Sequence, residues 1–210
     1  MSKRGILTIL SGFSGSGKGT VIQRLMERHD QYALSISATT RMPREGEKDG
    51  EAYFFRTKEE FERMIQEDAL LEYAKYVENY YGTPKAYVEE KLNEGKDVIL
   101  EIEIQGALQI KKKYPDTLML FLTPPSAEIL KERLTGRGTE TEDVILSRLG
   151  RAVEESEGIE QYDYLVINDN LEKCVETMHQ IIQKEHLRTS RNKVFIQNIR
   201  EDMKRFSKGD

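Results

Sequence analysis

The chain has 210 residues, of which 38% are hydrophobic and 33% are charged, and its formal net charge is −5. The length suits one α/β domain with insertions, and the composition is that of a globular protein with a charged surface. No apolar run reaches the ~20 residues that cross a membrane, the start lacks a signal peptide, and the charge gives no global reason to expect nucleic acid. We therefore expect a cytoplasmic protein with neither a membrane nor a nucleic-acid partner.

The first predicted strand covers residues 6–10 and leads directly into a glycine-rich segment, residues 12–20, with the sequence Gly-Phe-Ser-Gly-Ser-Gly-Lys-Gly-Thr. Apolar residues then repeat at helical spacing to about Arg28. A strand, a glycine-rich turn and a helix are the context of a phosphate-binding loop. Its glycines let backbone N–H groups face an anion, and the helix adds its positive end. Lys18 would place a mobile charge beside the β- and γ-phosphates of a nucleotide.

The hydroxyl in this loop comes one position later than in the commonest form of the motif, because Gly19 follows Lys18 and precedes Thr20. Loops that read Gly-Lys-Gly-Thr resemble those of small-molecule nucleotide kinases. The alternative is a plain Gly/Ser turn between a strand and a helix. Three glycines and a lysine at these offsets argue against that alternative. Which hydroxyl touches Mg²⁺ directly stays open.

The block after the next predicted strand, 33–36, departs from the strand–helix rhythm. Residues 37–47 form a polar segment that we do not expect to be buried, and its Arg41 and Arg44 suit capture of a phosphate. A flexible loop whose arginines face water is the alternative. We then expect the elements that follow to form a small inserted subdomain over residues 37–84: a strand at 51–55, a helix at 58–66, a strand at 70–76 and a turn at 79–84.

The rhythm resumes with a predicted helix at 87–93, a buried strand at 96–103, a helix from 105 and a strand at 117–122. Such alternation favours a parallel sheet with helices on both faces, in which ligands gather at the carboxyl ends of the strands. Glu101 and Glu103 would lie there beside the phosphate loop. They could hold Mg²⁺ through water or bond a sugar hydroxyl. A solvated strand end is the alternative.

Two helices are predicted next, from a Ser126 cap to 135 and over 142–156, joined by a Gly-containing turn. Their arginines could fold over a polyphosphate and exclude water, or form salt bridges within a plain helical hairpin. The last strand, 164–167, ends at Asn168-Asp169, and a helix over 171–186 follows.

The remaining features carry no predicted chemistry. The single cysteine, Cys174, excludes an internal disulfide and lies in a helical pattern as a packing residue. The three histidines are distant in sequence and are expected to be solitary. The modestly basic end of the chain, which includes a short helix at 194–199, reads as a solvated terminal segment that docks on a neighbour or on the body.

Five ordered segments resemble the guanylate kinase family over residues 5–187: the phosphate loop, residues 37–44, 79–83, 102–106 and 136–141. The resemblance implies an α/β P-loop kinase with a central parallel sheet flanked by helices, an inserted small mixed α/β nucleotide-monophosphate-binding subdomain and a helical lid. The implied core is 1–36, 85–125 and 157–188, with 37–84 binding GMP, 126–156 as the lid and 189–210 as the tail.

The resemblance also implies transfer of the ATP γ-phosphoryl group to GMP, and to dGMP, with Mg²⁺ as cofactor and ATP and GMP as partners. The implied catalytic cations are Lys18, Arg133, Arg137 and Arg148. Those implied to bind ATP are Gly12, Phe13, Ser14, Gly15, Ser16, Gly17, Lys18, Gly19, Thr20, Asn168 and Asp169. Those implied to bind GMP are Ser37, Arg41, Arg44, Glu47, Tyr53, Glu72, Tyr81, Thr83 and Glu103.

Thr20 and Glu101 are the implied contacts to the metal, through water. The family usually carries aspartates at 101 and 103 and often a serine at 83. Two other functions remain in competition: a kinase for another nucleoside monophosphate, and a non-catalytic protein-binding module of the same fold. Glu72 with Ser37 and Thr83 favours guanine, and the retained Lys18 and lid arginines favour catalysis. A homo-oligomer is left open.

Overall fold

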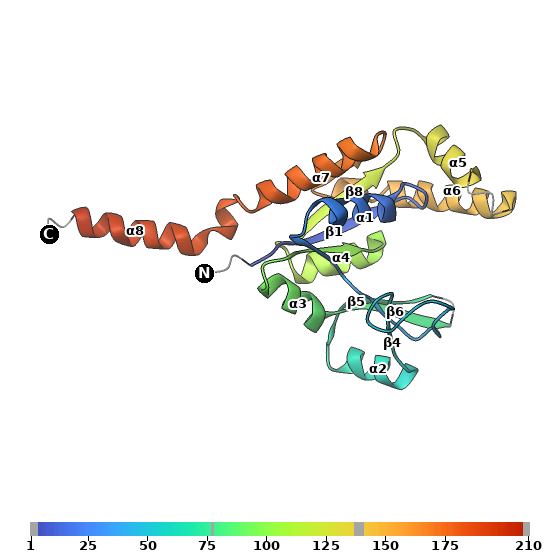
Figure 1. The fold of residues 1–210 in the computed structure, drawn as a ribbon, viewed down its shortest axis with the longest axis horizontal. Coiled ribbons are helices and arrows are strands. Elements are labelled where there is room, and N and C mark those ends of the chain that lie inside the picture. The colour runs from blue at the N-terminus through green and yellow to red at the C-terminus, as the bar shows by residue number, and fades with distance from the viewer. Residues whose placement is uncertain (1–3, 77, 137–140, 208–210) are drawn as a thin grey trace.

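A parallel sheet forms the centre of the chain in the computed structural model, which describes residues 4–76, 78–136 and 141–207 (Figure 1). Within these residues the sheet has five strands, all paired in parallel. In spatial order they are β2 (Tyr32–Leu34), β7 (Asp97–Glu101), β1 (Leu7–Gly12), β8 (Leu118–Thr123) and β9 (Tyr164–Ile167). The predicted fold class is confirmed.

Helices cover both faces of this sheet, because successive side chains of the strands alternate between them. One face packs on α1 (Lys18–Arg28) and α7 (Leu171–Glu185), the other on α3 (Lys85–Asn93) and α4 (Ile104–Lys113) (Figure 1). On the first face Leu10 and Ile99 belong to the same buried hydrophobic cluster as Cys174, whose side chain is buried as predicted. The alternation leaves the carboxyl ends of the strands free to carry polar groups.

A second, mixed sheet follows the first β–α–β unit and is built from β3 (Ala38–Thr39), β4 (Phe54–Phe55), β5 (Leu70–Tyr76) and β6 (Asn79–Pro84). It packs on α2 (Lys58–Gln66), whose Phe61 is fully buried and stacks on Tyr80 at 5.3 Å between ring centroids. The capping box of Thr57 and Glu60 starts this helix. This second sheet lies below the central sheet in the view of Figure 1.

Two predictions about this second sheet are wrong. Residues 79–84, predicted as a turn, form strand β6, which pairs with both β5 and β3. Residues 38–39, predicted to stay unburied, form β3 and are fully buried. Asn79, Gly82 and Pro84 disfavour a strand, and pairing of β6 with β3 and β5 outweighs that local preference. Thr39 is of a type that strands favour, and its burial follows from its place between β4 and β6. The predicted strand at 51–55 shortens to Phe54–Phe55.

The helical hairpin consists of α5 (Ala127–Thr135) and α6 (Glu142–Ser156), and Ser126 caps α5 as predicted. The final helix, α8 (Lys193–Ser207), follows a short 3-10 turn, η2 (Thr189–Arg191), and is longer than the short helix predicted at 194–199. In Figure 1 α8 extends away from the rest of the chain. Among the described residues no helix is long and apolar enough to cross a bilayer.

The histidines are not solitary, contrary to the prediction. The rings of His29 and His179 stack with centroids 3.8 Å apart, and the Tyr32 hydroxyl lies 2.7 Å from His179 Nδ1. His186 Nε2 lies 2.9 Å from Oδ1 of the buried Asp97. Packing of α1 and β7 on α7 brings these residues together, which their separation in sequence conceals.

Candidate active site

The phosphate loop joins β1 to α1, as the glycine pattern predicts. Gly15 and Gly17 have φ values of 90° and 94°, a left-handed conformation that glycine adopts without strain. Gly17 is the N-cap of α1, where the structure shows no side chain bonded to the first turn. The backbone N–H groups of this turn are therefore available to an anion. Gly12 is also required, because a Cβ there would lie 2.2 Å from the carbonyl oxygen of Leu122.

Side chains from three other segments hold this loop. The Asn168 amide donates from Nδ2 to the Ser16 carbonyl at 2.8 Å, and Arg133 donates from Nη2 to the Asn168 carbonyl at 2.7 Å. Arg148 donates from Nη1 to Ser14 Oγ at 3.0 Å. Lys18 folds back over the loop and donates from Nζ to the Gly12 carbonyl at 2.8 Å. Arg133 also donates from Nη1 to the Ser16 carbonyl at 3.3 Å, so Asn168 and Arg133 both contact loop backbone, whereas Asp169 is exposed.

A cavity of about 760 Å³ opens from the loop toward the second sheet. Predicted residues from the loop, from β7 and its following residues, from α6 and from the second sheet line it: Gly12, Ser14, Lys18, Tyr53, Glu101, Glu103 and Arg148. The structure therefore brings the phosphate loop and the two glutamates to one place, as the strand-end argument predicts. Cations and carboxylates face each other across a space large enough for nucleotide phosphates.

Several lining residues were missed by the sequence reasoning, chiefly Arg151 and Glu155 of α6, with Tyr76 of β5. Burial raises the pKa of Glu155, and the Lys18 ammonium opposes that rise. Arg148, Arg151 and Glu155 are spaced three and four residues apart, so they share one face of α6. That spacing is the signal that could have identified them.

A salt bridge to Glu47 holds Arg41 in the segment between β3 and β4. Two parallel bonds of 2.9 Å join its Nη1 and Nη2 to the carboxylate of Glu47, and its guanidinium lies 5.2 Å from the centroid of the Tyr53 ring. Glu47 also accepts from the Arg44 backbone N–H at 2.7 Å. The bonds from Arg41, and then that from Arg44, lower the pKa of Glu47 to about 2, so the pair stays charged over the physiological range.

Glu72 lies on the same sheet and is held by Thr83. The Thr83 hydroxyl, which is fully buried, donates to Glu72 Oε1 at 2.7 Å. Burial raises the pKa of Glu72, while the bonds from Thr83 oppose the rise. Gly106 was not singled out by itself, yet a Cβ there would lie 3.2 Å from Glu72 Oε2. A half-buried carboxylate with one oxygen already oriented is suited to accept two adjacent N–H donors.

The remaining residues predicted to bind nucleotide or metal do not all line the larger cavity. Ser37 accepts the Phe54 N–H through its carbonyl at 2.8 Å, and the Tyr81 ring lies 6.2 Å from that of Tyr53. Thr20 is exposed and lines a separate cavity with Gly15, Asn168 and Asp169, so it does not meet Glu101 in the larger one. Arg137 lies outside the described residues.

In the described part of the chain, no group of three or more His, Cys, Asp or Glu could hold a metal by itself. Glu101 and Glu103 nevertheless supply oxygens beside the loop. One or two carboxylates with substrate phosphates are the usual ligands of Mg²⁺. The donor set therefore fits a Mg²⁺ ion that arrives with a nucleotide and does not fit a permanently bound metal.

Comparison with known proteins agrees with this geometry. The guanylate kinase family model matches residues 4–185. A guanylate kinase of Caldanaerobacter subterraneus subsp. tengcongensis is 50% identical over 202 residues, which cover 96% of this chain and 98% of that protein. One of Lactococcus lactis subsp. lactis is 53% identical over 191 residues, with 91% and 93% covered.

The chain belongs to the guanylate kinase family. A solved structure, the guanylate kinase of Anaplasma phagocytophilum, superposes with a TM-score of 0.70 at 30% identity and covers 90% of each chain. Family membership confirms the resemblance drawn from the five sequence segments. The guanylate kinase relatives match nearly the whole length, so the loop, the second sheet and the hairpin all fall inside the match. The roles of individual side chains stay predictions.

Proposed function

We propose that the chain transfers the γ-phosphoryl group of ATP to GMP, and also to dGMP, giving ADP and the nucleoside diphosphate. The observation that carries this proposal is the cavity that Lys18 of the phosphate loop shares with Tyr76 of β5 and with Tyr53, the residue before β4. Two phosphorylated ligands can meet in such a space, one held from each side. Nearly full-length identity of about half to proteins named guanylate kinase supports the choice of GMP.

On the donor side, residues 12–20 would hold the ATP phosphates through backbone N–H groups at the start of α1. Lys18, Arg148 and Arg133 would bear the charge that develops during transfer, with Arg137 from the connecting turn. Arg148 supports this assignment because it already reaches the loop at Ser14. Asn168 and Asp169 would contact the adenine side, in the smaller cavity of about 390 Å³ beside Gly17.

On the acceptor side, the GMP phosphate would be held by Arg41, Arg44, Tyr53 and Tyr81. Glu47 would orient Arg41, and Glu103 would contact the nucleotide at the mouth of the loop. Ser37, Glu72 and Thr83 would read the base. Guanine presents N1–H and an exocyclic amine side by side, and one carboxylate can accept both. Adenine offers a ring acceptor there, so it would leave the carboxylate facing a lone pair.

The reaction needs positioning and charge stabilisation more than covalent help. A GMP phosphate oxygen, already ionised at neutral pH, attacks in line with the departing ADP, so no protein general base is required. Lys18 and the arginines spread the charge of the transferring group. Mg²⁺, contacted through water by Glu101, would neutralise phosphate charge when it is bound. Closure of residues 37–84 and 126–156 over the core would exclude water from the reacting group.

This activity would place the protein in cytoplasmic purine nucleotide metabolism. The direct test is turnover of GMP, dGMP, AMP, CMP and UMP with ATP and Mg²⁺ in a coupled assay. We expect kcat/KM for GMP to exceed that for AMP by about 10⁴-fold. A higher value for AMP or a pyrimidine nucleotide would assign another monophosphate kinase. Nucleotide binding without turnover of any of the five would favour the protein-binding module.

A further inference from the structure

Arg151 lies on the face of α6 that lines the large cavity, about one helical turn beyond Arg148. The two arginines differ in their contacts, because Arg148 donates to Ser14 of the phosphate loop. Arg151 is exposed, and no hydrogen bond or ion pair joins its side chain to another residue that the structure describes. The N–H groups of the Arg151 guanidinium are therefore available to a ligand in the cavity.

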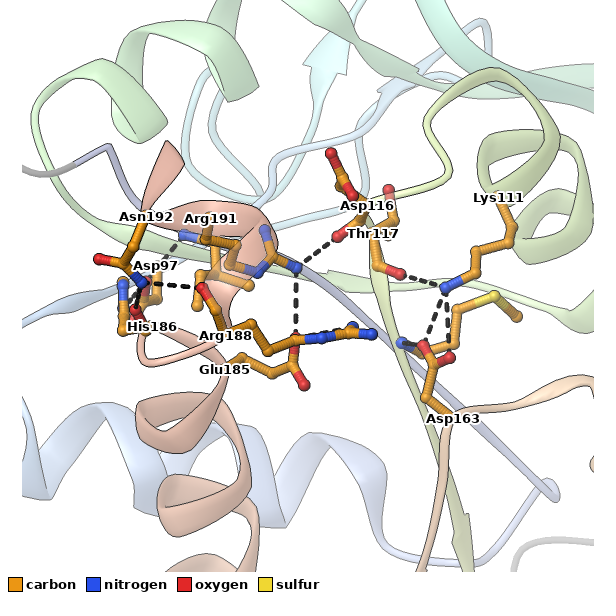
Figure 2. Close-up of polar contacts among 12 residues, drawn as sticks. Asp97, Lys111, Asp116, Thr117, Asp163, Glu185, His186, Arg188, Arg191 and Asn192 are labelled. Carbon is orange, nitrogen blue, oxygen red and sulfur yellow. Dashed lines mark hydrogen bonds and ion pairs between the residues drawn. The ribbon is translucent and has the colours of Figure 1, made fainter. Parts of the chain in front are cut away.

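Arginines that hold the fold together have a different environment. Figure 2 shows Arg191, which donates to the Asp116 carbonyl and pairs with Glu185 at 3.4 Å, and Arg188, which pairs with Glu185 at 3.2 Å. Glu185 is only 5% exposed, so these pairs fix the end of α7. Arg151 has no contact of this kind, and packing of the chain does not explain its place in the cavity wall.

The charges that line the large cavity balance only when Arg151 is counted. The cations are Lys18, Arg148 and Arg151, and the carboxylates are Glu101, Glu103 and Glu155. Burial raises the pKa of Glu155, and the charges of Lys18 and Arg151 oppose that rise. Without Arg151 the described wall would carry a net negative charge, which would repel a phosphate group.

The position of Arg151 along α6 relates it to the acceptor side of the site. With Glu155 it also lines a smaller cavity of about 190 Å³, whose wall includes the start of α4 at Glu103, Ile104 and Gln105. Arg148 is not among the described residues that line this smaller cavity. A Cβ on Gly106 would lie 3.2 Å from Glu72 Oε2, so the start of α4 also packs on the carboxylate proposed to bind guanine. The start of α4 thus connects the surroundings of Arg151 with those of Glu72.

The proposed closure of the hairpin should move Arg151 only a little. Helix α6 ends at Ser156, and a Cβ on Gly158 would lie 3.2 Å from Ile104 Cγ2, so the chain after α6 packs on the start of α4. Arg151 lies within about two helical turns of this attachment. Groups close to the attachment of a moving segment are displaced least, so Arg151 already faces the space that it would serve.

The acceptor phosphate needs a cation beyond those of the second sheet. Arg41 gives three of its five N–H groups to the Glu47 carboxylate and the Met42 carbonyl, and Glu47 offsets its charge. A phosphate dianion held there with Arg44 would therefore lack a full countercharge. A guanidinium meets this need well, because it bonds two phosphate oxygens at once.

We propose that Arg151 binds the phosphate of the acceptor nucleotide, whereas Arg148 serves the phosphates of the donor. Two arginines one turn apart on α6 would then hold the two reacting groups next to each other. This role rests on the proposed phosphorylation of GMP and deepens it.

The first test measures binding without turnover. GMP and guanosine are titrated by calorimetry into the full chain saturated with ADP and Mg²⁺, because ADP has no γ-phosphoryl group to transfer. Arg151→Gln should weaken GMP binding by about tenfold to a hundredfold, the effect of one charge-assisted bond. Binding of guanosine, which lacks the phosphate, should be unchanged. Arg188→Gln, an arginine that does not line the cavity, is the control and should bind both ligands as the natural chain does.

The second test is steady-state turnover of GMP. Arg151→Gln should raise the KM for GMP more than the KM for ATP, and Arg148→Gln should show the reverse. Arg151→Lys should recover part of the loss, because an ammonium group can meet the phosphate as a point charge. A merely structural role would not separate the two KM values. Circular dichroism and the unfolding midpoint of each variant should match those of the natural chain.

Equal weakening of GMP and guanosine binding by Arg151→Gln would overturn the proposal, because the phosphate would then not be the group that Arg151 contacts. A change confined to ADP and ATP would also overturn it and would assign Arg151 to the donor. Unchanged binding and turnover would do the same. A natural chain that binds GMP but does not phosphorylate it would refute the proposed activity alone, and the comparison of GMP with guanosine would still decide the role of Arg151.

Discussion

The phosphate loop and the second sheet form the two sides of the candidate site, and different kinds of bonds hold them. Around the loop, Lys18, Asn168 and Arg133 donate to backbone carbonyls. On the second sheet, Arg41 pairs with Glu47 and Thr83 with Glu72, side chain to side chain. The first kind of contact fixes a backbone shape before any ligand binds. The second kind orients side chains, Arg41 and Glu72, that must also bond the ligand when it binds.

This difference predicts different kinetic signatures on the two sides. Changes on the loop side should lower kcat or destabilise the fold, because that side must stabilise the transferring charge and keep a left-handed backbone that only glycine adopts without strain. Changes on the second sheet should alter KM or the choice of base. Four substitutions test this division, taken from the largest expected effect to the smallest.

Lys18→Ala should lower kcat for GMP by about 10³-fold or more, because the reaction relies on charge stabilisation. The unfolding midpoint should change little, since the bonds of the lysine to the Gly12 and Phe13 carbonyls lie at the surface of the cavity and not in the hydrophobic core. Lys112→Ala, an exposed lysine of α4, is the control and should keep full activity. Near-normal turnover of Lys18→Ala would mean that the loop does not hold the transferred phosphate.

Glu72→Gln should reduce the preference for GMP over AMP by about 10²-fold, because an amide cannot accept both guanine donors at once. The KM for GMP should change less than this ratio, because the groups that hold its phosphate are unaltered. Glu78→Gln, on the same hairpin and 87% exposed in its side chain, is the control. An unchanged ratio of kcat/KM values for the two nucleotides would contradict the assignment of Glu72 to the base.

The same substitution should stabilise the fold at neutral pH. Burial raises the pKa of Glu72 above its ordinary value of 4.5, so the native chain keeps this proton at a pH where the unfolded chain has lost it. The stability that results is complete below pH 4.5 and is lost as the pH rises through the folded pKa. Glu72→Gln should therefore unfold at higher temperature than the natural chain at pH 7, and the gap should close below pH 4.5. A gap that is independent of pH would exclude this titration as its cause.

Gly17→Ala should destabilise the chain by about 1–3 kcal/mol, because φ at this position is 94° and a Cβ would lie 2.6 Å from Asn168 Nδ2. The same substitution should also raise the KM for ATP. Gly19→Ala is a matched control two residues away, since a Cβ there meets nothing within 4 Å and the position is helical. Chemical unfolding compares the two. Equal losses of stability would contradict a special role for the left-handed glycine.

Glu47→Gln should raise the KM for GMP by about threefold to tenfold with kcat nearly unchanged, because Arg41 loses the partner that orients it. Glu51→Gln changes an exposed carboxylate of the same loop and should have no effect. A fall in kcat without a change in KM would mean that Arg41 acts on the transferring group and not on ground-state binding.

Local chemistry made much of the loop side predictable. Glycines that adopt left-handed φ, a lysine at a fixed offset and a capped helix act within a few residues of each other, so the phosphate loop and the Ser126 cap could be placed correctly. The strand-end argument likewise placed Glu101 and Glu103 beside the loop, because parallel strands end at one edge. The three-and-four spacing of Arg148, Arg151 and Glu155 was also readable, although only Arg148 was used.

What the sequence by itself determined is the fold class, the phosphate loop and the family that its five segments indicate. What only the tertiary structure decided is everything that depends on a partner distant in the chain. Residues 79–84 contain Asn, Gly and Pro and become a strand because β6 pairs with β3 and β5, and residues 38–39 are buried because β3 lies between β4 and β6. His29 meets His179 only where α1 packs on α7, and the exposure of α8 is recognised only once its direction relative to the body of the chain is known. Turn and loop signals reflect the conformational preferences of a few adjacent residues. Strand pairing, helix packing and exposure depend on residues that are distant in the sequence and close only in the folded chain.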